Sequence, residues 1–350
     1  MHHRDFSIAA NSGVTHKGKF LALAENGTKG PGGVATGVDH LKELGVTHVH
    51  ILPSYDYGSV DETRLQDNVY NWGYDPKNYN APEGSYSTDP YNPEARIREF
   101  KEMVRGLHRN GIRVIMDVVY NHTFVGDGSN FSLTVPGYFY RHKPDGSYSD
   151  ASGCGNETAS ERAMVRRYIV ESVKYWAEEY HVDGFRFDLA SILGRNEDGS
   201  PMNQPPLLKN LAGDPVLRNV KLIAEAWDAG GLYQVGSFPA YTRWAEWNGK
   251  YRDDMRSFLK GDYWFAQAAA NRLTGSLDLY TGQYKGYDSS INFLTCHDGF
   301  SLWDLYSYNG KHNEANGWNN SDGADDNRSW NCGVEGETTD PEIRKLRLRM

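Results

Sequence analysis

The sequence of 350 residues predicts an α/β fold of the (β/α)8, TIM-type barrel class. Two observations lead to this prediction. Apolar runs with β-strand character alternate with amphipathic helical patterns, and polar residues follow several of these runs directly. The alternation is the order expected of a parallel sheet whose strands are joined by crossover helices. Because the length fits one barrel with inserted loops, we expect residues 1–350 to form a single domain with no second domain.

Each element is predicted from the spacing of its apolar residues. The predicted helices are residues 37–44, 94–109 and 159–180, and the predicted strands are residues 46–52, 112–119, 182–187, 220–226 and 290–295. The apolar faces of the helices are formed by Val38, Leu41 and Leu44, by Ile97, Phe100, Val104 and Leu107, and by Val165, Ile169, Val173 and Trp176. Long stretches rich in Gly, Asn, Asp and Tyr at 55–90, 123–157 and 309–337 are expected to build the functional site.

Composition excludes several classes of function. The net charge of −9 is spread along the chain without a basic stripe, so we expect no nucleic-acid partner. The three cysteines lie far apart and form no C-x-x-C motif, so they predict neither a disulfide framework nor a zinc site. The sequence holds no apolar run of the roughly 20 residues that a membrane helix needs and no signal-peptide pattern, which predicts a cytoplasmic protein without a membrane partner.

Ionisable residues stand where four of the predicted strands end. His122 follows one strand, Asp188 and Glu225 follow the next two, and His297 and Asp298 follow the last. Since the carboxyl ends of barrel strands open on one face, these side chains are expected to converge. Unpaired carboxylates are costly to bury, so the pattern indicates chemistry, although strand-end capping or salt bridging is the alternative. Cleavage of a glycosidic bond needs one protonated and one ionised carboxyl group, which such a cluster supplies.

The segments DVVYNH, GFRFD, AEAWD and TCHD together resemble the four signature regions of the α-amylase superfamily of retaining glycoside hydrolases. All four occur in the family's order, and the resemblance covers nearly the whole chain. It implies that Asp188 is the nucleophile and that Glu225 is the general acid and base. It also implies that Asp298 braces the distorted sugar, and that residues 1–350 are a catalytic domain.

The resemblance also implies a set of substrate-binding residues, namely Tyr74, Asp117, His122, Arg186, Trp227 and His297. Arg186 would keep the nucleophile ionised, the two histidines would hydrogen-bond sugar hydroxyls, and Tyr74 would stack beneath the sugar. Structural alternatives stay open. Asp117 could belong to a buried network with Arg186 or a backbone amide, the histidines could be satisfied structural residues, Tyr74 an ordinary loop aromatic, and Trp227 part of the wall.

The first half of the chain, including YNWGYDPKNYNAPEGSYSTDP, resembles type I pullulanases. The second half, including EWNGKYRDDMRSF, resembles isoamylases and glycogen debranching enzymes, and the change falls between about Tyr180 and Asp188. Both groups imply hydrolysis of α-1,6 branch links in α-glucans such as pullulan, glycogen or amylopectin. A catalytically inactive glucan-binding fragment and an α-glucan transglycosylase are the alternatives, and the oligomeric state is left open.

Relative to this family, the predicted barrel is incomplete. The resemblance implies that the first strand is clipped and that the eighth strand and the C-terminal β-sandwich domain are missing. We expect no catalytic metal and no cofactor. The acidic segment DGADD at 322–326 could hold a structural calcium, but its spacing departs from known calcium loops and favours a solvated turn.

Overall fold

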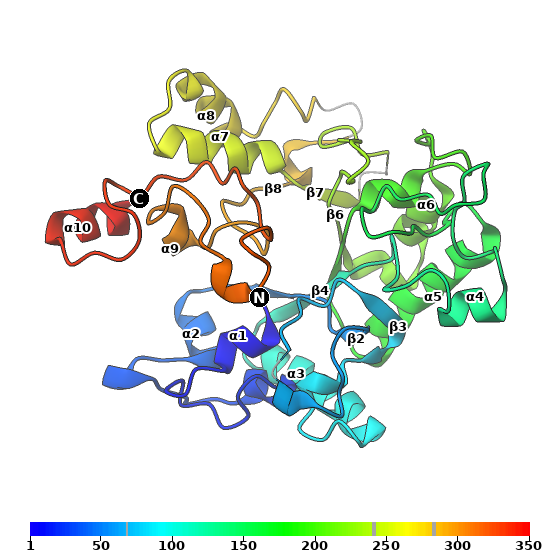
Figure 1. Ribbon diagram of the computed structural model, residues 1–350, viewed down its shortest axis with the longest axis horizontal. Coiled ribbons are helices and arrows are strands. Elements are labelled where there is room, and N and C mark those ends of the chain that lie inside the picture. Colours follow the sequence, from blue (N-terminus) through cyan, green and yellow to red (C-terminus); the bar gives the residue numbers. More distant parts are fainter. Residues whose placement is uncertain (68, 240–242, 282–284) are drawn as a thin grey trace. The chain divides into compact units, whose positions relative to one another are not determined.

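The computed structural model describes residues 1–67, 69–239, 243–281 and 285–350. The chain divides into two compact units. Unit 1 comprises Met1–Gln234 and Phe238–Trp244, and unit 2 comprises Val235–Ser237 and Ala245–Met350. Each unit is described by itself below, and Figure 1 labels the α-helices and most of the strands.

Unit 1 is built on four parallel strands in the order β1, β4, β5, β6. Their bounds are His48–Ile51 for β1, Arg113–Val118 for β4, Gly184–Phe187 for β5 and Lys221–Ala224 for β6. All four predicted strands are present, and each is shorter than the apolar run that predicted it. In the register, Asp117 on β4 lies opposite Arg186 on β5, and Phe187 lies opposite Ala224 on β6. Consecutive strands therefore end side by side.

Two long helices, α3 (Pro93–Arg109) and α5 (Ala163–Glu179), connect these strands and pack on each other. Helix α3 begins where Pro93 occupies the first turn and the Asn92 side chain accepts a hydrogen bond from the Glu94 amide. The Phe100 ring lies 5.2 Å from that of Trp176, measured between centroids. All four apolar residues predicted for α5 are buried.

Two predicted helix faces need correction. Ile97 is 39% exposed and Leu44 is 61% exposed, although both were expected in the core. The buried face of α3 instead includes Met103, which has no exposed surface. The predicted start of α5 at residue 159 was also wrong, because the Ala159 amide donates to the Phe139 carbonyl at 2.8 Å instead of entering a helix.

The rest of unit 1 surrounds the parallel strands. An antiparallel hairpin pairs β2 (Tyr55–Tyr57) with β3 (Pro76–Pro82). The remaining α-helices are α1 (His3–Ser7), α2 (Gly37–Glu43), α4 (Asn130–Thr134) and α6 (Pro206–Gly213). Short 3-10 helices cover Phe20–Ala24, Pro31–Gly33, Leu65–Asp67, Gly84–Tyr86, Ala190–Gly194 and Val216–Asn219.

Unit 2 contains a short parallel pair, β7 (Trp244–Trp247, which begins at the last residue of unit 1) and β8 (Ser290–Ile291). Its helices are α7 (Gly249–Leu259), α8 (Phe265–Leu273), α9 (Leu302–Leu305) and α10 (Pro341–Arg349), with 3-10 turns at Tyr287–Ser289 and Glu314–Asn316. A small core gathers Leu305, Tyr306 and Cys332, with Ile343 and Leu346 of α10 packed against it. The predicted strand 290–295 was too long, because only its first two residues pair with β7.

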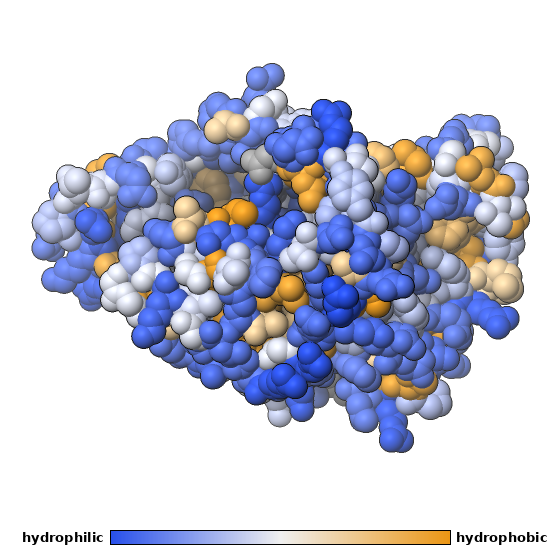
Figure 2. Space-filling model, turned by 90° about the horizontal axis from the view of Figure 1, so that it is seen from below, coloured by the Kyte–Doolittle hydropathy of each residue, from blue (hydrophilic) through white to orange (hydrophobic). Residues whose placement is uncertain are grey.

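The face drawn in Figure 2 is mainly hydrophilic, and hydrophobic side chains form small separate groups on it. Across the described parts of the chain, no helix has both the length and the apolar character that a bilayer crossing requires.

Candidate active site

Asp188 and Glu225 lie at the carboxyl ends of the neighbouring strands β5 and β6. Each carboxylate residue directly extends a strand, and its backbone amide continues the ladder: the Asp188 amide donates to the Val118 carbonyl at 2.9 Å, and the Glu225 amide donates to the Phe187 carbonyl at 3.1 Å. Asp188 is 8% exposed and Glu225 is 3% exposed. Two nearly buried carboxylates therefore sit at adjacent strand ends.

One guanidinium group joins the two carboxylates. Arg186 places Nη1 3.0 Å from Asp188 Oδ1 and Nη2 2.9 Å from Glu225 Oε1. Because both oxygens contact nitrogens of the same planar group, they lie within roughly 8 Å of each other. Nη1 also lies 2.9 Å from Asp117 Oδ1, so one cation faces three carboxylates. Although burial alone would lower it, the pKa of Arg186 is raised well above its usual value by Asp117 and Glu225.

Further donors fix the two carboxylates individually. The Asn121 side-chain amide donates to Asp188 Oδ2 at 2.8 Å, and the Leu189 backbone amide donates to Glu225 Oε2 at 2.8 Å. Leu189 adopts a left-handed conformation with φ +39°, which a residue with a β-carbon rarely does. This turn directs the amide that follows Asp188 toward the carboxylate on the neighbouring strand.

Asp117 and Tyr74 form a buried contact beside Arg186. The Tyr74 hydroxyl donates to Asp117 Oδ2 at 2.7 Å, and His50 Nε2 lies 3.4 Å from the same oxygen. Burial, with the nearby negative charge of Asp117, raises the pKa of the Tyr74 phenol well above its usual value. Asp117 has no exposed surface, so its contacts are those of an internal network at the base of the site.

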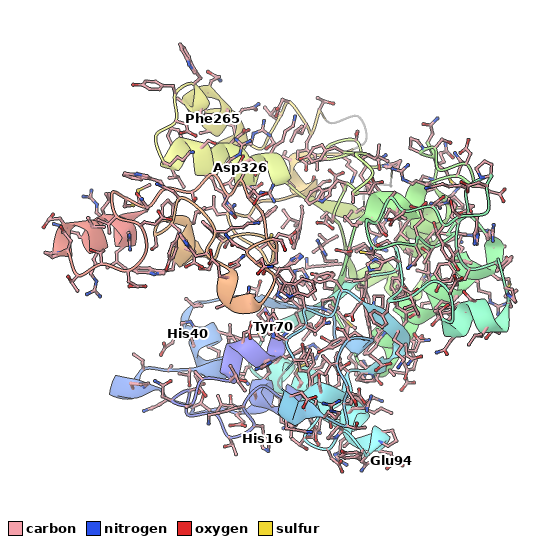
Figure 3. The ribbon with its side chains drawn as sticks, in the orientation of Figure 1. His16, His40, Tyr70, Glu94, Phe265 and Asp326 are labelled. Carbon is pink, nitrogen blue, oxygen red and sulfur yellow. The ribbon has the colours of Figure 1, made fainter. Side chains whose placement is uncertain are left out.

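His122 is also held on both sides of its ring. Its Nδ1 lies 2.6 Å from Asn121 Oδ1, and its Nε2 lies 2.8 Å from the Tyr74 carbonyl oxygen. Burial lowers the pKa of His122, although Asp188 acts in the opposite direction. His122 therefore connects the loop that carries Tyr74 to the end of β4. Tyr70, four residues before Tyr74 in the same loop, is labelled in Figure 3.

Trp227 lies two residues beyond Glu225 in the turn that follows β6. Its ring is parallel to that of Tyr233, with 5.8 Å between the centroids and 10° between the planes. The two residues also form an isolated β-bridge, so this turn is a small hairpin. Seven of the nine predicted site residues thus belong to unit 1, and six of them form one connected set: Tyr74, Asp117, His122, Arg186, Asp188 and Glu225.

His297 and Asp298 belong to unit 2. His297 Nε2 lies 3.5 Å from Asp298 Oδ1, and the His297 ring lies 6.0 Å from that of Trp247. The Asp298 side chain is 53% exposed. The convergence of Asp298 with Asp188 and Glu225 stays a prediction.

The acidic segment at 322–326 makes contacts with protein groups. Asp325 pairs with Lys311 at 2.7 Å, Asp322 accepts from the Asn316 side chain at 2.8 Å, and Asp326 accepts from the Arg328 amide at 2.9 Å. Within the described ranges, clusters of three groups that could ligate a metal are Asp56 with Glu62 and Glu83, and Cys296 with His297 and Asp298. The expectation of no catalytic metal and no cofactor stays a prediction.

Sequence reasoning missed two contributors to this site, His50 and the Leu189 amide. Asn121 was noted beside His122 at a strand end but was given no role of its own. His50 lies in an apolar strand run, where an ionisable residue is itself unusual. The Leu189 amide carries no side-chain signal, because its role depends on backbone conformation.

The described geometry can be compared with known proteins. Residues 20–131 match the family model described as "Alpha amylase, catalytic domain". The chain is 44% identical over 362 residues to Isoamylase 3, chloroplastic, of Oryza sativa subsp. japonica, covering 100% of this chain and 45% of that protein. It is 39% identical over 329 residues to pullulanase of Bacillus subtilis strain 168, covering 88% of this chain and 44% of the relative. Each of the two resemblances therefore extends over most of the chain.

Solved structures give the same result for the fold. The crystal structure of apo pullulanase from Paenibacillus barengoltzii has a TM-score of 0.80 and 38% identity, covering 100% of this chain and 51% of the other. Pullulanase from the same organism in complex with maltohexaose and α-cyclodextrin has a TM-score of 0.77 and 42% identity, covering 87% of this chain and 49% of the other. The chain thus spans about half the length of these relatives, and its parallel strands are those of an incomplete (β/α)8 barrel.

Proposed function

We propose that this chain, which belongs to the α-amylase superfamily, hydrolyses α-1,6 branch links of α-glucans and retains the anomeric configuration. The observation that carries the proposal is the single Arg186 guanidinium bonded to both Asp188 and Glu225 at adjacent strand ends. Retaining hydrolysis requires two carboxyl groups about 5–5.5 Å apart, and this spacing lies within the limit of roughly 8 Å that the shared cation sets.

In the proposed first step, Asp188 attacks the anomeric carbon while Glu225 gives its proton to the departing glycosidic oxygen. The product is a glycosyl ester on Asp188 and a free sugar hydroxyl. In the second step, Glu225 takes a proton from water, and the water oxygen displaces Asp188 from the sugar. The first step requires Glu225 to carry a proton while Asp188 is ionised.

The other predicted residues take supporting roles in the proposal. Tyr74 stacks beneath the sugar, His297 hydrogen-bonds its hydroxyls, and Trp227 lines the site. The predicted sugar contact of His122 is not kept in the proposal, because both of its ring nitrogens already contact protein oxygens, Asn121 Oδ1 and the Tyr74 carbonyl. Asp117 holds Arg186 in place, because its carboxylate contacts both the Arg186 guanidinium and the Tyr74 hydroxyl. Asp298 is proposed to brace the distorted ring.

Incubation with pullulan and with glycogen, reading reducing sugar and chain length together, tests the proposal. We expect release of reducing ends by the unmodified chain and loss of at least about 10³-fold in Asp188→Asn and Glu225→Gln. The matched control is Asp145→Asn, which should keep full activity, because the Asp145 carboxylate is exposed and accepts hydrogen bonds from Ser147.

The products also separate the alternatives. Glucan binding with no reducing ends above the Asp188→Asn background would favour an inactive binding fragment. Longer chains without net new reducing ends would favour a transglycosylase. Release of maltotriose from pullulan would indicate that pullulan is the preferred polymer, and release of long linear chains from glycogen would indicate glycogen.

The cytoplasmic location stays a prediction, since the plant relative is named chloroplastic. The absence of nucleic-acid and membrane partners also stays a prediction.

A further inference from the structure

A buried ion pair links the loops that follow β5 and β6. Arg195 places Nε 2.9 Å and Nη2 2.6 Å from the same oxygen, Oδ2, of Asp228. The side chain of Asp228 has no exposed surface and that of Arg195 is 13% exposed. Asp228 lies three residues beyond Glu225, and Arg195 lies seven residues beyond Asp188. The pair is therefore a second connection between the two strand ends, in addition to Arg186.

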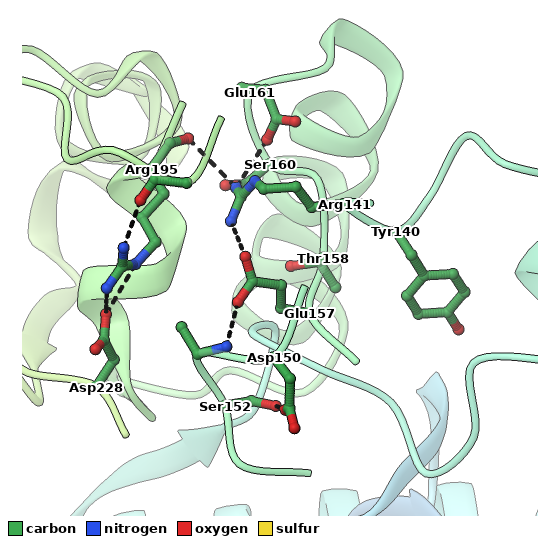
Figure 4. A network of polar contacts seen from close by, with 12 residues as sticks. Tyr140, Arg141, Asp150, Ser152, Glu157, Thr158, Ser160, Glu161, Arg195 and Asp228 are labelled. Atoms are coloured by element: carbon green, nitrogen blue, oxygen red, sulfur yellow. Dashed lines mark hydrogen bonds and ion pairs between the residues drawn. The ribbon is translucent and has the colours of Figure 1, made fainter. Parts of the chain in front are cut away.

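A second buried pair, Arg141 with Glu157, connects the loop after β4 to the first pair (Figure 4). Arg141 Nη2 donates to the Arg195 carbonyl at 3.3 Å, and Glu157 Oε2 accepts from the Ala151 amide at 2.6 Å. We call these four charged residues, Arg141, Glu157, Arg195 and Asp228, the rim ring.

One backbone hydrogen bond closes the rim ring. The Ala229 amide, next to Asp228, donates to the Ala151 carbonyl at 2.9 Å. Contacts thus run from Asp228 through Arg195, Arg141 and Glu157 to Ala151, and return to Ala229. Closed sets of charged hydrogen bonds fix the geometry of loops that would otherwise be mobile, because a loop cannot move without breaking a buried pair.

Asp228 also shapes the turn that carries Trp227. Its Oδ1 accepts from the Leu232 amide at 3.1 Å, while its own amide donates to the Leu232 carbonyl at 3.0 Å. The side chain therefore closes the turn from the inside, and the turn brings Trp227 and Tyr233 into parallel stacking. Glu225 does not depend on these contacts, because Arg186 and the Leu189 amide hold its carboxylate.

We infer that Arg195 and Asp228 are positioning residues, which hold the turn bearing Trp227 at the distance from Glu225 that a bound glucan requires. The inference rests on the proposed function. It assigns the rim ring to substrate affinity and leaves the chemical step to Asp188, Glu225 and Arg186. A purely structural pair would affect stability alone, whereas a positioning pair affects KM and sugar binding at temperatures where the protein stays folded.

The test measures KM and kcat on pullulan, and maltotriose binding by intrinsic tryptophan fluorescence, for Asp228→Asn, Arg195→Met and the double variant. Maltotriose has no α-1,6 link, so its dissociation constant is measured without turnover. We expect KM and the maltotriose dissociation constant to rise about tenfold or more, with kcat within about twofold. The double variant should be no worse than either single variant, because both remove the same contact.

Asp198→Asn is the matched control. It makes the same chemical change in the Arg195 loop, where Asp198 accepts hydrogen bonds from the Ser200 amide and hydroxyl, and it should alter neither constant. Unchanged maltotriose binding in folded Asp228→Asn, or a loss confined to kcat, would overturn the inference. An unmodified chain that binds maltotriose but releases nothing from pullulan or glycogen would count against the proposed function. The maltotriose dissociation constants of the variants would still show whether the rim ring determines sugar binding.

Discussion

Removing the charge of Arg186 should lower both the free energy of unfolding and the rate of hydrolysis. The contacts of Arg186 indicate how large the loss of stability should be. Arg186→Met leaves Asp117, Asp188 and Glu225 buried without their shared cation. Breaking a buried ion pair by removing one partner costs about 3–5 kcal/mol, which is a large part of the 5–15 kcal/mol that typically separates folded from unfolded protein. We therefore expect a free energy of unfolding lower by about 3–5 kcal/mol at pH 7.

The assay is urea unfolding followed by circular dichroism, with initial rates on pullulan measured in parallel. The loss of stability should shrink as the pH falls toward 4, because protonation removes the charges that have lost their partner. Arg186→Lys restores one charge but not the planar fork that reaches Asp188 and Glu225 together, so it should recover part of the stability and little of the activity.

The control is Arg64→Met, which breaks an exposed ion pair with Asp67 and should change stability by less than about 1 kcal/mol. If Arg186→Met matched this control in both stability and rate, the shared-guanidinium account of the site would be wrong.

Two further predictions concern a backbone turn and a buried acid. Leu189→Gly keeps the amide that donates to Glu225 and removes the strain of its positive φ, so activity should persist. Leu189→Pro removes the donor and also prevents the positive φ, because the proline ring fixes φ near about −65°, so it should lower kcat by at least about 10²-fold in pullulan assays. Burial raises the pKa of Glu83 to about 8, so this residue binds its proton more tightly when folded. The contribution of Glu83 to stability should therefore fall as the pH rises from about 4.5 to 8, by up to about 1.4 kcal/mol per pH unit. In unfolding titrations the stability of the wild type relative to Glu83→Gln should decrease over this range, and a constant difference would refute the assignment.

Much of the fold could be predicted because local signals and tertiary packing agree. Helix α3 was placed within one residue, since Asn92 caps it and Pro93 suits its first turn. The start of α5 was missed because the Thr158 amide pairs with the Asn121 carbonyl at 2.9 Å, a contact between distant segments. Strand β8 ends early because its partner β7 stops at Trp247, after which Asn248 caps α7. Periodicity in one segment carries no information on the length of its neighbour.

The sequence predicted those residues of the candidate site that stand directly after an apolar strand. Asp188 and Glu225 were predicted at strand ends, and both lie at the ends of adjacent parallel strands. Their catalytic roles stay a prediction. The His50 contact with Asp117 was not found, because it depends on two strands being neighbours. The rim ring was missed for a related reason: its charged residues come from three loops, and nothing in their spacing indicates that they pair.

The account depends most on Asp188 acting as a nucleophile beside Glu225, and covalent trapping tests this directly. The chain is incubated with a 5-fluoro-α-glucosyl fluoride, which forms the glycosyl ester but hydrolyses slowly, and the digested protein is analysed by mass spectrometry. We predict one glycosyl adduct, on the peptide containing Asp188, whose formation is abolished in Asp188→Asn. An adduct on another residue, or rapid consumption of the reagent with inversion of the anomeric centre and no adduct, would contradict the central claim.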